Sequence, residues 1–336
     1  MNNKKTFEGS STCIVPINRS NTNFFGDVIN KMKSMQVLPI LVLMAIYFAI
    51  TTDEFLTGNN MVTLLVGNSV MAIATIGQAL VLMTGGIDLS VATVISCSAI
   101  YSAVAMNAYN GSILMGLIVA LGVGLFFGLI NGIAIGVFRM TPFIVTLATQ
   151  LMARGMAFVK SQGLGIPGAP ESLVALSQEG PFGIPTIVVI VVLLFVVFGV
   201  LLSKTTWGRY VTLTGSNEKS AKYVGINTKL IIFSVYAVSG LLAGFAGFVS
   251  IIYLGCAIPG VGDPLLLLIV GSAILGGISM NGGSGSMLKA GLGVLIFATL
   301  FNGLNLSNIP FSFQLIIQGV VIIIGMILSS SFEKKR

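Results

Sequence analysis

Residues 112–138 read SILMGLIVALGVGLFFGLINGIAIGVF and contain no charged side chain. The hydrocarbon core of a membrane is about 30 Å thick, and an α-helix rises about 1.5 Å per residue. About 20 consecutive apolar residues are therefore enough to cross it. This stretch predicts a helix that spans a membrane, with some length left for tilting or for ends in the interface.

Similar apolar stretches recur along the chain. Of its 336 residues, 55% are hydrophobic and 8% are charged, whereas a soluble domain carries about 25% charged residues. The sequence thus predicts an all-α polytopic membrane protein with about ten transmembrane helices, and it excludes a cytosolic enzyme, a disordered chain and a disulfide scaffold. The predicted spans are 36–51, 61–83, 91–108, 112–138, 142–159, 184–203, 228–253, 262–280, 287–304 and 310–330.

The basic residues indicate the orientation of these spans. Cytoplasmic segments carry an excess of Lys and Arg, and with both termini cytoplasmic every basic residue except Arg154 and Lys160 falls on the inner side. The net charge of +7 is then a topology signal, so no nucleic-acid partner is expected. The predicted organisation is a cytoplasmic segment 1–35, one transmembrane domain 36–331 with an inner loop 204–229, and a cytoplasmic tail 332–336.

The sequence has no motif for a metal or a bound cofactor. It contains no histidine, and its three cysteines, Cys13, Cys97 and Cys256, lack the spacing of metal ligands. No GxxxxGK[ST] motif occurs, so the chain has no P-loop with which to bind ATP. The formal GxGxxG at 163–168 lies in an outer loop without a preceding strand, which argues against a dinucleotide site.

Small residues recur at four-residue spacing in two of the predicted spans. Residues three or four apart share one helix face, and glycines there let another backbone approach closely. Helix packing is the default interpretation of this pattern. Its members are Gly124, Gly128, Gly132 and Gly136 in one span and Gly240 and Gly244 in another.

Polar side chains inside apolar spans are candidates for a translocation path, because lipid penalises them unless they face protein or water. Thr146, Gln150 and Arg154 recur every four residues and therefore share a face. Hydrogen bonds between helices explain any single one of these polar residues equally well. The remaining candidates are Asn68, Gln78, Asp88, Asn131 and Asn302.

Two glycine-rich stretches interrupt the apolar pattern. The first is TGGIDLS at 84–90, and the second is LGGISMNGGSGSMLK at 275–289. The second falls on an inner connection, and the first is either a tight turn at the inner side or a break in a helix at membrane depth. The sequence leaves both alternatives open.

The inner loop 204–229 contains a short predicted helix. Ser216 or Asn217 can cap its N-terminus, Glu218 suits its first turn, Lys222 its last turn, and Gly225 the left-handed residue that follows. Such a helix could dock onto another protein, or it could be a solvated connector.

One catalytic motif occurs in an apolar stretch. Residues 260–263 read GVGD, the GxGD of intramembrane aspartyl proteases, which need a second aspartate nearby so that two carboxylates can share a proton. Asp88 is the available partner for Asp263, and the predicted topology puts it at the opposite face. The motif is therefore a weak signal for a protease.

Several motifs together resemble the permease subunit of bacterial ABC importers for ribose, xylose, arabinose, galactose and related sugars, a group that includes autoinducer-2 permeases. The similar segments occur in the order of that family and cover most of the chain from the second span onward. They are 84–96 (TGGIDLSVATVIS), 128–155 (GLINGIAIGVFRMTPFIVTLATQLMARG), 205–227 (TTWGRYVTLTGSNEKSAKYVGIN), 236–248 (YAVSGLLAGFAGF), 275–288 (LGGISMNGGSGSML) and 301–306 (FNGLNL).

This resemblance implies a type II importer fold in the bacterial cytoplasmic membrane. It implies a second permease subunit, identical or paralogous, an ABC ATPase subunit that binds ATP and Mg²⁺, and an extracytoplasmic sugar-binding protein. It also makes the short inner helix a coupling helix that sits on the ATPase. The coupling residues are Asn217, Glu218, Ala221, Lys222 and Gly225, whereas Lys219 and Ser220 depart from the family pattern.

The expected function is thus ATP-driven import of a monosaccharide such as ribose, with no catalysis by this chain. An ion-coupled secondary carrier is the alternative, with Asp88 and Asp263 as the carboxylates that such a carrier needs. A GxGD protease and a branched-chain amino-acid permease are further possibilities. IDLS at 87–90 is more typical of the sugar branch, whereas Ala92 and the segment 263–270, which has lost the acids usual in that family, depart from it.

Overall fold

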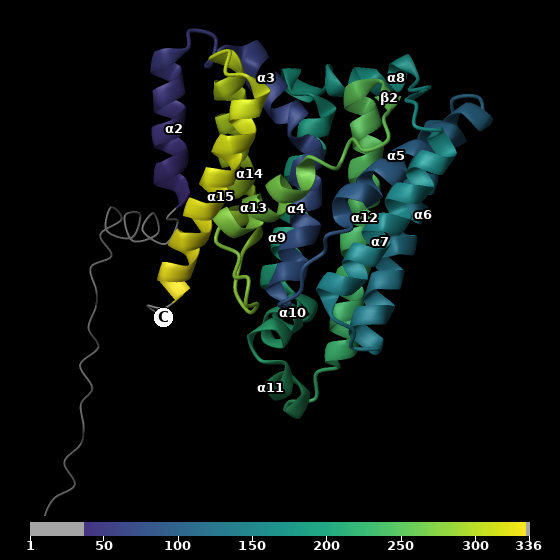
Figure 1. Ribbon diagram of the computed structural model, residues 1–336, viewed down its shortest axis with the longest axis vertical. Coiled ribbons are helices and arrows are strands. Elements are labelled where there is room, and N and C mark those ends of the chain that lie inside the picture. The colour runs from purple at the N-terminus through teal and green to yellow at the C-terminus, as the bar shows by residue number, and fades with distance from the viewer. Residues whose placement is uncertain (1–36, 334–336) are drawn as a thin grey trace, which may run out of the picture. The chain divides into compact units, whose positions relative to one another are not determined.

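The computed structural model describes residues 37–333, and the predicted cytoplasmic segment 1–35 and the last residues of the tail lie outside this range. Within it the chain is helical, and its helices lie side by side (Figure 1). The longer helices are α2 (Val37–Thr51), α4 (Ser69–Met83), α5 (Val91–Ala108), α6 (Ile113–Gly132), α7 (Pro142–Ser161), α9 (Thr186–Lys204), α12 (Thr228–Leu254), α14 (Met287–Leu306) and α15 (Phe311–Glu333). The shorter helices are α3 (Gly58–Gly67), α8 (Glu171–Val174), α10 (Thr206–Ser216), α11 (Glu218–Tyr223) and α13 (Leu265–Leu275).

Each predicted span contains a helix. Among the described residues, six helices are long and apolar enough to cross a membrane, and a seventh span arises if α3 and α4 are counted together. The segments Val37–Thr51, Leu265–Leu275 and Phe311–Ile327 are shorter apolar helices. The chain is therefore an all-helical polytopic membrane protein, and the number of about ten spans stays a prediction.

Two predicted spans have a different form in the structure. The span predicted at 61–83 is broken at Asn68, where α3 and α4 meet at 44°. The Asn68 side chain donates to the carbonyl of Leu64 at 2.8 Å, a local bond that competes with the regular helix. The span predicted at 262–280 shortens to α13, because Gly277 has a φ of +88° and ends the helix.

Several local elements were missed by the prediction from sequence. The inner loop contains a second helix, α10, before the short helix α11. A π-helix, η1 (Ile133–Val137), continues α6. One short antiparallel pair joins β1 (Ile166–Pro167) to β2 (Cys256–Ala257), a local addition to an otherwise all-helical chain. The outer loop expected at 160–183 also contains α8 and two 3₁₀ turns.

Helix α12 packs along α6 where the glycines of both helices lie. A Cβ built on Gly128 would lie 2.7 Å from the carbonyl oxygen of Tyr236, too close for a real side chain. A Cβ on Gly132 or Gly136 would lie 2.8 Å from the backbone oxygen of Phe233 or Lys229. Gly124 faces Gly240 and Gly244 in the same way. The two backbones therefore approach too closely for any larger residue at these positions.

Helix α10 is fastened to the start of α12. The indole Nε1 of Trp207 donates to the hydroxyl of Ser234 at 2.9 Å.

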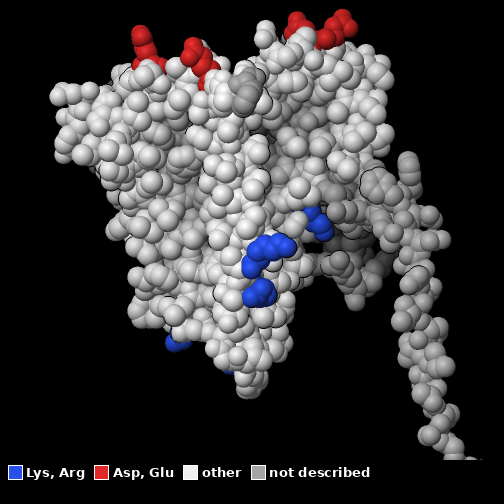
Figure 2. Space-filling model, turned by 180° about the vertical axis from the view of Figure 1, so that it is seen from behind, with Lys and Arg blue, Asp and Glu red and all other residues white. Residues whose placement is uncertain are grey.

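Acidic and basic side chains lie toward opposite ends of the described part of the molecule. Figure 2 shows acidic side chains gathered at one end and basic side chains toward the other.

Candidate functional site

A buried carboxylate marks the first glycine-rich stretch. Asp88 is 2% exposed and lies in the connection from α4 to α5. Its Oδ1 accepts from the backbone N–H of Ser90 at 3.0 Å and from the Ser90 hydroxyl at 2.6 Å. Its Oδ2 accepts from the hydroxyl of Ser239 at 3.1 Å. Since Ser239 lies in the middle of α12, the TGGIDLS segment is a break inside the helices and not a turn at their ends.

The hydrogen bonds continue from Asp88 into two further helices. The side-chain N–H of Asn131 donates to the Ser90 hydroxyl oxygen at 2.9 Å, and the Thr149 hydroxyl donates to Asn131 Oδ1 at 2.8 Å. Ser90, Asn131 and Thr149 are each at most 2% exposed. We call Asp88, Ser90, Asn131, Thr149 and Ser239 the polar network. It joins α6, α7, α12 and the start of α5. The buried polar groups of these side chains form hydrogen bonds with one another.

Replacing Asp88 by alanine is expected to destabilise the protein by several kcal/mol. The substitution leaves the Ser90 N–H and the Ser239 hydroxyl buried without their acceptor, and each such loss costs about 1–3 kcal/mol. Asp88→Asn keeps one acceptor oxygen and should cost less. Unfolding in detergent measures the effect, with Asp53→Ala as an exposed control. Equal stability of Asp88→Ala and the wild type would contradict the inferred importance of the network.

The three residues of the polar face predicted on α7 have different environments. Thr146 is buried and donates to the carbonyl of Pro142 at 2.9 Å, within its own helix. Gln150 is partly buried, and its side-chain oxygen has no hydrogen-bond partner in the described part of the chain. Arg154 is exposed and forms an ion pair with Asp263 at 3.0 Å. These three residues share a helix face as predicted, but no hydrogen bond joins their side chains to one another within residues 37–333.

No side-chain hydrogen bond joins Asn302 or Gln78 to the polar network in the described part of the chain. Asn302 on α14 exchanges two amide hydrogen bonds with Asn60 on α3, at 2.7 and 2.9 Å. This pair corresponds to the alternative interpretation, a contact between helices. Gln78 is fully buried in α4, and neither polar atom of its side chain has a partner among the described residues.

The expectation that Asp263 and Asp88 lie at opposite faces is wrong. The N–H of Gly262 donates to the hydroxyl of Ser96 at 2.9 Å, which places the GVGD turn against the early part of α5. The segment turns back between the helices because glycine at 262 permits contact with the backbone of Ala92. Asp263 nevertheless pairs with Arg154 and Asp88 with hydroxyls, so within the described chain no hydrogen bond joins the two carboxylates.

The short predicted helix in the inner loop is present as α11. Its N-cap is Asn217, whose Oδ1 accepts from the backbone N–H of Ser220 at 3.0 Å. Glu218 lies in the first turn and Lys222 in the last, and Gly225 follows with a φ of +84°. Ala221 is the buried residue of this helix, at 3% exposure.

Glu218 ties α11 to a segment far away in the sequence and to the start of the helix that follows. Its carboxylate forms ion pairs with Arg139, at the end of η1, and with Lys222 at 2.9 Å. Thr228, the first residue of α12, donates to Glu218 Oε1 at 2.9 Å and accepts from Arg139 at 2.9 Å. Sequence reasoning missed both partners, because Arg139 is distant in the sequence and Thr228 is a hydroxyl residue whose side chain could bond within its own helix.

The electrostatics keep Glu218 ionised at neutral pH. Partial burial raises the pKa of its carboxyl, but hydrogen bonds from Lys222 and Thr228 and the charges of Arg139 and Lys222 outweigh burial and lower it below its usual value. The ion pair with Arg139 is therefore present in its charged form under physiological conditions.

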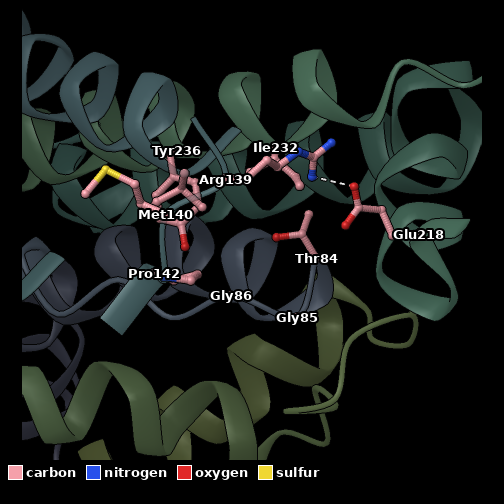
Figure 3. Close-up of a pocket in the computed structure, with 10 residues that line it drawn as sticks. Thr84, Gly85, Gly86, Arg139, Met140, Pro142, Glu218, Ile232 and Tyr236 are labelled. Atoms are coloured by element: carbon pink, nitrogen blue, oxygen red, sulfur yellow. Dashed lines mark ion pairs between the residues drawn. The ribbon is translucent and has the colours of Figure 1, made fainter. Parts of the chain in front are cut away.

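A pocket of about 320 Å³ opens beside this ion pair. Figure 3 shows the backbone of the TGG segment on one side of it and the paired Arg139 and Glu218 on the other. The lining residues are Thr84, Gly85, Gly86, Ile135, Arg139, Met140, Pro142, Glu218, Ile232 and Tyr236. The hydroxyl of Tyr236 also donates to the carbonyl of Ile87 at 3.3 Å, next to Asp88. The pocket thus lies between α11 and the polar network.

Comparison with known proteins agrees with a helical membrane chain that takes part in transport. Residues 60–326 match a family described as "Branched-chain amino acid transport system / permease component". The chain belongs to this family, so it is a permease component of a transport system and not an enzyme. The family description names branched-chain amino acid transport, the wider group to which the sugar permeases expected above are related.

Curated relatives are similar over nearly their whole length. The ribose import permease protein RbsC of Bacillus subtilis is 35% identical over 306 residues, with 90% of this chain and 94% of the relative covered. The L-arabinose transport system permease protein AraH of Escherichia coli is 33% identical over 304 residues, covering 88% and 91%. The D-allose transport system permease protein AlsC of Escherichia coli is 32% identical over 295 residues, covering 88% and 90%. The resemblance to sugar permeases is therefore confirmed. No solved structure is significantly similar to the chain.

Proposed function

We propose that this chain is the permease subunit of an ATP-driven importer that carries a monosaccharide, ribose or a related sugar, across the bacterial cytoplasmic membrane. The names of the curated relatives, which cite ribose, allose and arabinose, support a sugar as substrate. Membership of the family supports a role in transport. The identity of the transported sugar is part of the proposal.

The observation that carries the proposal is the construction of α11. On its inner side Ala221 is buried and Glu218 is held by Arg139, Lys222 and Thr228. On its outer side Tyr223 is 91% exposed and Val224 is 73% exposed. A firmly attached helix that presents an aromatic and a branched aliphatic side chain has the character of a protein-binding surface. We assign this surface to a separate ABC ATPase, which would hold ATP and Mg²⁺.

The charge distribution supports the orientation that such a complex needs. Basic side chains lie toward the end that carries α11, and acidic ones gather at the opposite end (Figure 2). Because cytoplasmic segments are enriched in Lys and Arg, we propose a cytoplasmic position for α11, and the basic residues of the sequence support the same side for both termini. A second permease subunit and an extracytoplasmic sugar-binding protein complete the proposed assembly.

The test is purification of the tagged chain in mild detergent from its native cells, followed by uptake assays in vesicles. We expect a P-loop ATPase and a sugar-binding protein to co-purify. Vesicles that contain the complex should take up labelled ribose, D-allose or L-arabinose when ATP is inside and the binding protein outside. Uptake that persists without ATP and disappears when a proton gradient is dissipated would instead indicate an ion-coupled carrier.

A further inference from the structure

The pocket beside the Arg139–Glu218 ion pair combines one polar and one apolar wall. The polar wall consists of the two paired side chains, which are 30% and 37% exposed and therefore still reachable from the pocket. The apolar wall includes Met140, Pro142 and Ile232. Small-molecule sites combine apolar surface with a few converging polar groups, and this pocket offers both.

The size of the pocket limits the ligand to a small molecule. Ligand pockets range from about 300 to 1,000 Å³, and this one, at about 320 Å³, is at the lower end. A single sugar ring is of the size that such a pocket holds, whereas a peptide or a nucleotide would need more room.

The charged groups favour a neutral ligand with several hydroxyls. Arg139 is already paired with the Glu218 carboxylate, which it shares with Lys222, so an anion would have to compete with that carboxylate. The ion pairs and the Thr228 hydrogen bond of Glu218 are made through Oε1, and Figure 3 shows its other oxygen turned toward Thr84. A guanidinium carries five N–H donors, while a carboxylate only accepts. Neighbouring hydroxyls of a sugar can donate to one and accept from the other.

The residues that line the pocket belong to separate segments, and we expect these segments to move relative to one another. Glu218 belongs to α11, whereas Arg139 and Met140 lie between η1 and α7, and Gly85 and Gly86 lie in the segment that leads to Asp88. A shift of α11 would therefore change the polar wall directly.

We propose that this pocket is an inward-side binding site for the transported sugar, with Glu218 and Arg139 bonding its hydroxyls and α11 forming a movable wall. This inference rests on the proposed function, because it assigns the sugar of the importer to a particular site. A displacement of α11 by the ATPase would separate Glu218 from Arg139 and release the sugar to the cytoplasm.

The first experiment fills the pocket without changing its charge. Met140→Trp places a large side chain in the apolar wall, and Met152→Trp is its matched control. Both methionines are half-exposed, at 51% and 50%, but Met152 does not line the pocket. We expect Met140→Trp to lower ATP-driven uptake of labelled ribose, D-allose or L-arabinose at least tenfold, with the ATPase still bound. Met152→Trp should retain the wild-type rate, and unchanged uptake by Met140→Trp would overturn the inference.

The second experiment measures occupancy with a smaller substitution. In the purified complex, Met140→Cys is treated with N-ethylmaleimide, and modification is followed by mass spectrometry of the peptide that contains position 140. We expect the transported sugar to slow this modification severalfold and a sugar that is not transported to leave it unchanged. A transporting complex whose modification rate is the same with and without sugar overturns the inference and leaves the proposed function intact. A wild-type complex that takes up none of the three sugars with ATP overturns both.

Discussion

Gly128→Leu is expected to prevent the protein from folding. A Cβ at this position would already lie 2.7 Å from the carbonyl oxygen of Tyr236, and it would also lie 3.1 Å from the Cα of Ala237. Overpacking of a core costs about 1–3 kcal/mol when neighbouring side chains can move. Here the neighbours are backbone atoms of α12, so α6 and α12 would have to separate along their contact. We expect the loss to exceed that range.

Gly122→Leu is the matched control, because it lies on the same helix and no other atom would lie within 4 Å of a Cβ there. The two variants are compared by the yield of monodisperse protein in one detergent and by the midpoint of thermal unfolding. We expect Gly122→Leu to resemble the wild type. A Gly128→Leu variant with the wild-type midpoint would show that α6 and α12 can separate without loss of the fold.

Tyr223→Asp is expected to release the ATPase from the complex and thereby to stop uptake. Tyr223 is 91% exposed at the end of α11 and forms no part of the core, so the permease itself should fold normally. Loss of an aromatic anchor from an interface typically costs about 2 kcal/mol or more. This corresponds to an affinity about thirtyfold weaker, because each 1.4 kcal/mol is a factor of ten.

The control for this variant is Tyr109→Asp, since Tyr109 is 60% exposed in the turn between α5 and α6, away from α11. Binding of the purified ATPase to the permease in nanodiscs gives both affinities directly. We expect Tyr109→Asp to bind the ATPase like the wild type. Full ATPase affinity in Tyr223→Asp would remove the main support for the coupling role of α11.

The spans and α11 could be predicted because their determinants are local. Apolar runs identify spans through length and composition, and the caps of α11 lie within the segment from Asn217 to Gly225. The π-helix η1 and the bend at Asn68 had no comparable signal. Both are small changes in backbone hydrogen bonding inside stretches whose composition suits a regular helix.

The candidate site could be predicted only in part, because it is formed by contacts between segments that are distant in the sequence. Asn131 and Asp88 could be selected because polar side chains are costly inside apolar spans. Their partners Ser90, Thr149 and Ser239 are hydroxyl residues, which can bond within their own helix and therefore carry little information. The pairing of Arg139 with Glu218 depends on how η1 and α11 meet, a tertiary relation that no local pattern encodes.

Trp207 gives the protein a built-in optical reporter. It is the single tryptophan of the chain, and its indole N–H is bonded to Ser234 where α10 meets α12. Indole emission depends on hydrogen bonding and on contact with water, so the native fluorescence of the purified permease reports on one contact of the inner loop alone. Displacement of α10 from α12 during a transport cycle would therefore appear as a spectral shift, without any label and against no background from other tryptophans of this chain.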